Sequence, residues 1–273
     1  DLHLSLRRQR QMCIRDRNIG ADRIKYIQGD TDYLPSGRGS GGSAATITGG
    51  SAVINAAEIL IQTGNQIAAD VLKCDISDIQ YDNGNFYQMN DPDTALDWSE
   101  IAQYSNQPDG LDIMGEFTPS APTYPNGCHI CEVEIDTSTG KCYVQDYVAV
   151  EDVGTALYPV LIEGQILGGI VQGISQALGE SLVYDETGQL STGSFMDYQM
   201  PIASDFPKFR IKTHPVKTKI NPLGAKGVGE SGTVGALAAT ISAIQHALVS
   251  VGADTIEMPA TPHRIWQKLK HNA

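Results

Sequence analysis

The pattern of apolar and polar positions along the chain predicts an alternation of helices and short strands. Helical spacing of apolar residues predicts three longer helices, at 52–71, 159–182 and 233–250. Two-residue alternation predicts strands at 23–28, on both sides of the turn Asp82-Asn83-Gly84 within 74–98, at 129–135 and 142–152, and at 208–213. Ser99-Glu100-Ile101 predicts a short capped helix. The expected fold class is therefore α+β, with mixed sheets and packed helices.

Two subdomains are expected, at residues 18–120 and 121–273, because several prolines separate the two halves of the pattern. These are Pro119, Pro122 and Pro125. Residues 1–17 differ from the rest, with five arginines against two aspartates and without the apolar centre of a secretory signal. They are interpreted either as a disordered tail or as non-native sequence joined to the chain. We favour the second interpretation and leave them out of the fold prediction.

Composition and charge argue against several classes of protein but do not identify one. The formal net charge of −13, with no basic cluster after residue 17, gives no footprint for nucleic acid or an anionic membrane surface. Five irregularly spaced cysteines favour reduced thiols and a cytoplasmic location over a secreted disulfide scaffold. Apolar stretches are cut by Gly, Gln or Thr, so no membrane span is expected.

The predicted helix at 159–182 has two unlike faces. One carries a core stripe of Ile162, Ile166, Ile170, Ile174 and Leu178. The other carries Gly164, Gln165, Gly168, Gln172, Gln176 and Gly179. Each internal glycine costs about 1 kcal/mol relative to alanine, so a close neighbour must justify them. Packing against another helix and contact with a bound ligand are both open as explanations.

Two stretches match the G-x-G-x-x-G pattern, at Gly37–Gly42 and Gly227–Gly232. A dinucleotide-binding fingerprint must leave a buried strand directly, and neither stretch follows a predicted strand closely enough. A nicotinamide-dependent oxidoreductase using the second turn is therefore an alternative that we disfavour. Glycine-rich turns that open helices still present bare N–H groups to an anion, so both are candidate cradles for phosphate, pterin or oxo groups.

Cys128-His129-Ile130-Cys131 has the spacing of a metal or redox C-x-x-C motif. It lies where a strand is expected to begin, and residues three apart on a strand point to opposite faces. No second pair follows at zinc-like spacing. We therefore interpret both thiols as packed strand residues.

Glu230 is the candidate catalytic base, because it lies in a Gly-Val-Gly-Glu-Ser-Gly turn immediately before a predicted helix. The positive end of the helix dipole favours an ionised carboxylate at this place. A glutamate that caps the helix is an equally good interpretation from spacing alone. The second interpretation would make the chain a non-catalytic binding or assembly domain.

Four motifs in order resemble a known family over roughly residues 19–266. They are QGDTDYLPSGRGSGGSAAT (28–46), PTYPNGCHICEVEIDTSTG (122–140), EGQILGGIVQGISQALGE (163–180) and NPLGAKGVGESG (221–232). In this combination the chain resembles the C-terminal part of the large, molybdopterin-binding subunit of xanthine dehydrogenases, aldehyde oxidases and aerobic carbon monoxide dehydrogenases.

That resemblance implies a role for each matching position. The backbone of Gly42, Ser43 and Ala44, and the glycines Gly227 and Gly229, would contact the pterin cofactor. Gln172 would hydrogen-bond the cofactor near molybdenum, which the pterin rather than the protein holds. Glu230 would take the proton from a water-derived hydroxyl that attacks an aldehyde or N-heterocycle carbon, while hydride passes to the molybdenum centre. The implied activity is oxidative hydroxylation of a small molecule.

The resemblance also implies components beyond this chain. The cofactor is expected in its cytosine dinucleotide form, and 2Fe–2S clusters and FAD are expected on partner domains or subunits. An N-terminal part of the same subunit, with a further cofactor motif and most of the substrate pocket, is missing from this chain. Many relatives read Gly-Ser-Arg-Ser where this chain has Gly42-Ser43-Ala44-Ala45. Any contact of that arginine is therefore absent here, and the fragment is expected to be inactive alone.

Overall fold

The structure is a computed structural model, and it confirms the α+β class. It describes residues 24, 25, 27, 29–34, 37, 39–105 and 111–270. The predicted tail at 1–17 lies outside these residues, as does much of the predicted strand at 23–28, whose described members Ile24, Lys25 and Ile27 are not in a strand. The chain forms two compact units. Described residues up to Pro122 join 218–225 in the first, and 123–217 join residues from Lys226 onward in the second.

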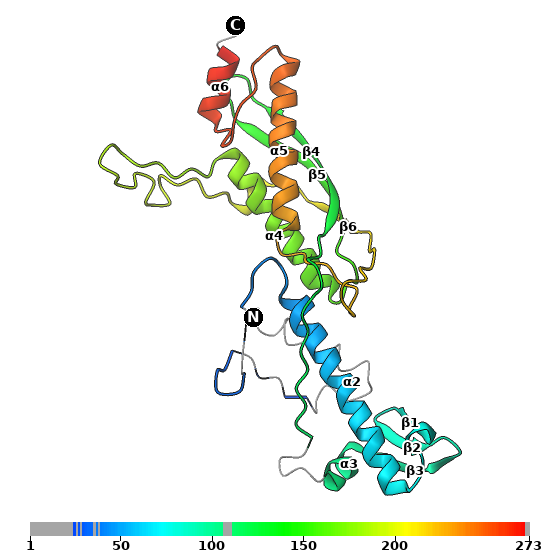
Figure 1. The fold of residues 1–273 in the computed structure, drawn as a ribbon. Coiled ribbons are helices and arrows are strands. Elements are labelled where there is room, and N and C mark those ends of the chain that lie inside the picture. Colours follow the sequence, from blue (N-terminus) through cyan, green and yellow to red (C-terminus); the bar gives the residue numbers. More distant parts are fainter. Residues whose placement is uncertain are drawn as a thin grey trace. The chain divides into compact units, whose positions relative to one another are not determined.

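The first unit is built on one long helix, α2 (Ala45–Leu72), which packs against a small sheet (Figure 1). The sheet is antiparallel in the order β1 (Ile79–Asp82), β2 (Asn85–Gln88), β3 (Asp91–Asp97), and a 3-10 turn at Ile76–Asp78 leads into it. Phe86 is fully buried at its centre. The ring lies against Gly64 of α2, where a Cβ atom would come within 2.4 Å of it.

Local sequence accounts for the turn and the short helix of this unit. Asn83 and Gly84 have φ angles of 50° and 83°, values that the predicted two-residue hairpin turn requires. Helix α3 (Trp98–Tyr104) begins at a capping box between Asp97 and Glu100, so the predicted capped helix is confirmed. Strand β3 was not predicted, because Asp91-Pro92-Asp93 is poor strand sequence and pairing with β2 supplies what propensity lacks.

The second unit contains the predicted hairpin and a third, parallel strand. β4 (Asn126–Ile135) and β5 (Cys142–Asp152) pair antiparallel, and β6 (Arg210–Thr213) pairs parallel to β5. The hairpin at 129–135 and 142–152 is thus confirmed, as is the strand within 208–213. The expected regular alternation is wrong at one place: Gln145 is an extra residue in β5, so Val144 and Tyr147 both face inward.

Three helices complete the second unit. α4 (Pro159–Leu178) and α5 (Ser231–Ser250) pack against each other, and α5 also packs on β4 (Figure 1). α6 (Pro262–Lys270) was not predicted and buries Ile265 against the end of α5. The predicted isoleucine stripe of α4 forms the core between the helices and the sheet. Its buried members are Ile162, Ile166, Ile170 and Ile174.

Close backbone contact joins α4 to α5. A Cβ on Gly232 would lie 2.3 Å from the carbonyl oxygen of Ile166, and a Cβ on Gly169 would lie 2.9 Å from the amide nitrogen of Thr233. One turn later, a Cβ on Gly173 would meet Ala236 at 2.7 Å. Contacts therefore advance in the same direction along both helices, which makes the pair parallel. Only residues without a side chain allow the two backbones to come this close.

Helix α5 leaves the expectation of no membrane span a prediction. Among the described residues, Ser231–Ser250 is one helix long and apolar enough to cross a bilayer by length and composition. A core helix of a water-soluble protein passes the same test. Here α5 buries a stripe against α4 and β4, at Gly232, Ala236, Thr240, Ile244 and Leu248. This packing accounts for the apolar residues of that stripe.

Helix α4 ends four residues earlier than predicted. Gly179 follows it, and a Cβ there would lie 2.2 Å from the side-chain amide of Gln199. The chain between these residues runs out from the helices and back, as the yellow-green segment of Figure 1 shows. Phe195 and Met196 on this segment are among its most exposed apolar side chains.

Gly232→Ala is expected to lower the free energy of unfolding by roughly 1–3 kcal/mol, because its methyl group would collide with the Ile166 carbonyl. Gly164→Ala is the control, since no described atom lies within 4 Å of that position and alanine favours a helix by about 1 kcal/mol. Urea unfolding followed by circular dichroism would measure both variants. Equal stability of the two would contradict the close contact.

Candidate functional site

Glu230 lies at the N-terminal end of α5. It is the N-cap residue, with φ −116° and ψ −9°, and its carbonyl accepts a hydrogen bond from Val234 N at 3.2 Å. Its side chain makes no capping hydrogen bond, although the backbone caps the helix. The residue is exposed in this chain. The interpretation of Glu230 as a carboxylate that caps the helix is therefore wrong, and its carboxylate faces the surface of the second unit.

Gln172 lies on α4 close to the same end of α5. The hydroxyl of Thr233 donates a hydrogen bond of 3.1 Å to Oε1 of Gln172. Thr233 belongs to the first turn of α5, so this bond connects Gln172 to the turn that Glu230 begins. Gln172 and Glu230, which the sequence proposed separately, are thus connected through Thr233, three residues after Glu230. Thr233 was not predicted as part of the site.

The sequence left two explanations open for the glycines of α4: packing against another helix, and contact with a bound ligand. Each explanation fits some of them. Gly169 and Gly173 touch α5, and Gly179 touches Gln199, so packing explains these three. Gly164 and Gly168 have no described atom within 4 Å of an added Cβ. They precede Gln172 at four-residue intervals and share its side of the helix. Packing within this chain leaves these two glycines unexplained.

The turn before Glu230 is held by an ion pair that the sequence analysis missed. Lys226 Nζ lies 2.5 Å from Asp152 Oδ2, and both side chains are about one-eighth exposed. Asp152 also accepts hydrogen bonds from the backbone N–H groups of Gly154 and Val216. Gly227 is buried directly after this anchor. The second glycine-rich turn therefore leaves a fixed point at the end of β5.

The environment of Asp152 favours its charged form. Burial alone would raise the pKa of this carboxyl, but the hydrogen bonds from Lys226, Val216 and Gly154 and the charge of Lys226 outweigh burial. The pKa of Asp152 is accordingly lowered from its ordinary value. This carboxylate stays ionised around neutral pH and holds Lys226.

Gly42, Ser43 and Ala44 lie in the first unit, at the N-terminal end of α2. Gly42 and Ser43 have φ angles of 58° and 54°, and such a conformation costs about 1–3 kcal/mol for a residue other than glycine. Ala44 is the N-cap and supplies no side-chain hydrogen bond to the first turn of α2, which also contains no acidic residue. This end of α2 has the form that binds anions through backbone N–H groups.

A buried polar cluster in the second unit was not predicted from the sequence. His129 Nδ1 lies 2.7 Å from the hydroxyl of Tyr147, and His129 Nε2 lies 2.7 Å from Glu151 Oε1. Burial raises the pKa of Tyr147, and the charges of Cys131 and Glu151 raise it further, so the phenol keeps its proton. The signal was present in the spacing, since Tyr147 and Glu151 flank Ala149, the residue paired with His129.

Both cysteines lie on β4, but the interpretation of both thiols as packed residues holds for Cys131 and is wrong for Cys128. Cys128 is exposed on β4, whereas Cys131 is partly buried against the core. Burial raises the pKa of Cys131 to about 11, although a hydrogen bond with Thr240 lowers it in part. The described residues contain no group of three or more His, Cys, Asp or Glu that could hold a metal ion.

The structure also disfavours the nicotinamide alternative. β6 ends at Thr213, and the described residues from there to Gly227 contain no strand that leads into the turn. A dinucleotide fingerprint requires such a strand. The first pattern, at Gly37–Gly42, precedes α2 without a described strand before it.

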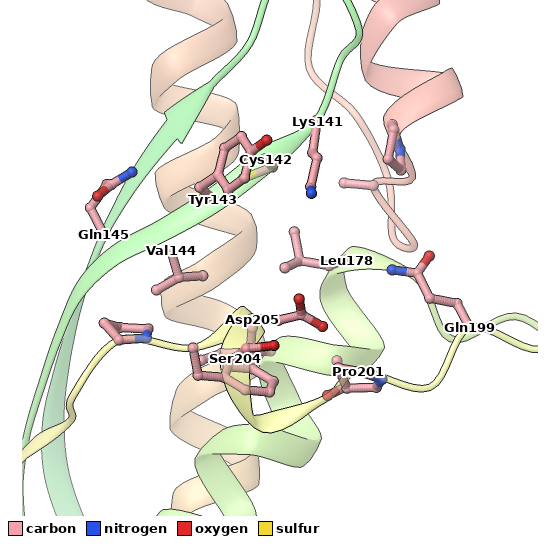
Figure 2. A pocket seen from close by; sticks show the side chains of 16 residues that line it. Lys141, Cys142, Tyr143, Val144, Gln145, Leu178, Gln199, Pro201, Ser204 and Asp205 are labelled. Carbon is pink, nitrogen blue, oxygen red and sulfur yellow. The ribbon is translucent and has the colours of Figure 1, made fainter.

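A pocket of about 610 Å³ lies elsewhere in the second unit (Figure 2). It opens between the start of β5, the end of α4 and the segment 199–207. Lys141, Leu178 and Asp205 surround it in this view. Neither Gln172 nor Glu230 lines it. This pocket is therefore separate from the site that the sequence predicted.

At the start of α5, Thr233 links the carboxamide of Gln172 to the turn that carries Glu230. Comparisons with known proteins identify the family. The sequence profile of the molybdopterin cofactor-binding domain family matches residues 9–207. The chain belongs to this family, which confirms the resemblance found in the four motifs. Because the match begins at residue 9, the status of 1–17 stays a prediction.

Two relatives are similar to most of this chain. The chain is 33% identical over 269 residues to the carbon monoxide dehydrogenase large chain of Hydrogenophaga pseudoflava, covering 96% of this chain and 34% of that one. It is 36% identical over 243 residues to the nicotine 6-hydroxylase large subunit of Paenarthrobacter nicotinovorans, covering 86% and 30%. The chain thus spans about a third of the length of these relatives.

Solved structures show the same fold. The Cu,Mo carbon monoxide dehydrogenase in its carbon monoxide reduced state matches with a TM-score of 0.87 at 32% identity, over 96% of this chain and 34% of that chain. Quinoline 2-oxidoreductase from Pseudomonas putida 86 matches with a TM-score of 0.80 at 31% identity, over 96% and 34%. The α+β fold is that of a molybdenum-cofactor-binding domain.

Asp152→Asn is expected to destabilise the protein at pH 7, because it leaves Lys226 partly buried without its partner. The folded-state pKa of Asp152 lies below the value of about 3.9 in the unfolded chain. Its contribution to the free energy of unfolding is therefore full above that value and is lost as pH falls through the folded pKa.

Urea unfolding between pH 7 and pH 3 would measure this contribution. The difference between wild type and Asp152→Asn should shrink below about pH 4. Asp146→Asn is the matched control, because Asp146 pairs with Arg210 at an exposed place where a salt bridge contributes little. A difference that stays constant over the whole pH range would contradict the ion pair.

Proposed function

We propose that this chain is the cofactor-binding C-terminal portion of the large subunit of a molybdenum hydroxylase. The reaction is the oxidative hydroxylation of an electron-poor carbon in an aldehyde or N-heterocycle, with oxygen derived from water. One observation carries the proposal: the bond between Thr233 and Gln172 joins the helix of Gln172 to the turn of Glu230. Family membership adds the cofactor class.

The residues present fit the cofactor. Gly164 and Gly168 leave the backbone of α4 accessible beside Gln172, so a flat ring can approach where a Cβ would block it. Because Thr233 donates to Oε1 of Gln172, the carboxamide presents its Nε2 donor to an acceptor on the cofactor. In the first unit, the Gly42-Ser43 turn and the start of α2 suit the pyrophosphate of a dinucleotide form.

Glu230 supplies proton transfer. When bound, the molybdenum–pterin group supplies the two-electron acceptor for the substrate hydride. Glu230 then accepts, at a carboxylate oxygen, the proton of the water-derived hydroxyl that attacks the substrate carbon. Its position at the start of α5 keeps the negative charge next to the positive end of the helix before the proton arrives.

The names of the relatives support the proposed substrate class and partners. Nicotine 6-hydroxylase and quinoline 2-oxidoreductase are named for positions on N-heterocycles, which supports that substrate class. Several relatives are named as the large chain or a subunit of a complex. We extend this to partners that carry 2Fe–2S clusters and FAD and that pass electrons onward. The cytosine dinucleotide form of the cofactor, the rest of the large subunit and a cytoplasmic location complete the proposal.

Glu230→Gln is expected to lower kcat by about 10²–10⁴-fold, because the amide keeps the shape of the carboxylate but cannot accept the proton. The measurement is steady-state turnover of the complete enzyme with its partners, normalised to molybdenum content. Glu163→Gln is a control on the exposed surface of α4. Normal turnover of Glu230→Gln would show that the base is another group.

Gly168→Ala is expected to reduce the molybdenum content of the purified enzyme several-fold, because the methyl group would occupy the face that receives the cofactor. The same substitution should not lower the stability of the cofactor-free protein, since alanine favours the helix. Gly173→Ala is the contrast, because its methyl would strike α5 and lower stability. Full molybdenum content in Gly168→Ala, by elemental analysis, would exclude this face as the cofactor site.

A further inference from the structure

We propose that His129 is a positioning residue for Glu230: it seats the first turns of α5 against strand β4 and so sets the direction of the Glu230 carboxylate. The proposal rests on the function given above, in which Glu230 is the base. His129 is not a catalytic residue, because its side chain is 4% exposed and lies beneath the helix rather than at the surface.

Hydrogen bonds hold the ring of His129 in one orientation. Both ring nitrogens are used, with Tyr147 at Nδ1 and Glu151 at Nε2. Since Tyr147 keeps its proton, its hydroxyl can donate to Nδ1, and Nε2–H then donates to Glu151. Both partners come from β5 and are fully or nearly fully buried. The ring is therefore fixed to the sheet, and it offers α5 a rigid surface.

Two glycines leave space for this cluster. A Cβ on Gly235 of α5 would lie 2.6 Å from Cε1 and from Nδ1 of His129. A Cβ on Gly127 of β4 would lie 2.7 Å from Oε2 of Glu151. The imidazole of His129 thus occupies the space that a side chain at position 235 would need. Any residue other than glycine at that position would lie closer to the ring than van der Waals packing permits.

Gly235 is little more than one helical turn beyond Glu230. One turn earlier, Gly232 rests on the Ile166 carbonyl of α4, and Thr233 is bonded to Gln172. The beginning of α5 is therefore held between α4 and His129. Glu230 is the N-cap residue of α5, so a shift of the helix away from either contact would move Glu230 relative to Gln172.

A role in stability alone would not require a histidine here. An inward-facing strand position beside apolar core residues is ordinarily filled by an aliphatic side chain. Burying three polar groups is favourable only when each is satisfied, and a satisfied network makes its surroundings rigid. The hydrogen-bonded cluster lies where the beginning of α5 packs on β4, at Gly235.

The test compares His129→Ala with His129→Gln in the complete, molybdenum-loaded enzyme. We expect His129→Ala to lower kcat per molybdenum at least tenfold while KM stays within twofold. His129→Gln should recover a part of that loss, because its amide can still donate to Glu151. Hydrogen exchange measured by mass spectrometry should rise in peptides covering 231–237 and stay unchanged in those covering β5.

Gly235→Ala perturbs the same contact from the helix side without removing a hydrogen-bonding group. We expect it to lower kcat in the same way, although alanine is the better helix former. Ser242→Ala, at an exposed position further along α5, is the matched control for helix propensity and should leave kcat unchanged.

An unchanged kcat per molybdenum in both His129→Ala and Gly235→Ala would overturn the proposal, even if both variants melt at lower temperature. Lower kcat without faster exchange in 231–237 would also overturn it, because the effect would then reach the reaction by another route. Failure of the proposed function is distinguishable. In that case Glu230→Gln keeps its turnover, while the exchange data still report whether His129 seats α5.

Discussion

The near-contact of the backbones of α4 and α5 is the constraint on which the second unit depends. Gly169, Gly173 and Gly232 let the helices pack without side chains between them, so their spacing is set by backbone atoms. Such packing is stiff, because displacement by a few tenths of an ångström meets steep repulsion. Functional groups on the two helices therefore keep a fixed relation. Gln172 and the turn of Glu230 are related in this way, through the hydroxyl of Thr233.

The strands hold the same helix end at two further points. Lys226 ties the glycine-rich turn before Glu230 to Asp152, at the end of β5. His129 supports α5 from β4, with Tyr147 and Glu151 behind it. A carboxylate at the surface is thus carried by a turn whose neighbours are buried and paired. This is the arrangement expected of a group whose direction matters more than its own contacts.

Much of the fold could be predicted from the sequence because the signals are local. Spacing identified α2, α4 and α5, and Asn83-Gly84 identified a hairpin turn from its need for positive φ. Glu230 and Gln172 were found by resemblance and by an unusual glycine face. Contacts between elements that are distant in the sequence could not be predicted. Which glycines of α4 are packed and which are open depends on where α5 lies. The hydrogen bonds of His129 with Tyr147 and Glu151 depend on the register of β4 and β5.

That register depends on a single additional residue, Gln145, in β5. If Gln145 were paired with Glu132 instead of bulged, His129 would face Val148 rather than Ala149, and the polar cluster would be split between the two faces of the sheet. An insertion or deletion between this bulge and His129, within 130–132 or 146–148, would shift the register in the same way. Length variation among descendants of this chain should collect instead in the protruding segment between Gly179 and Gln199, where no strand pairing has to be kept in step.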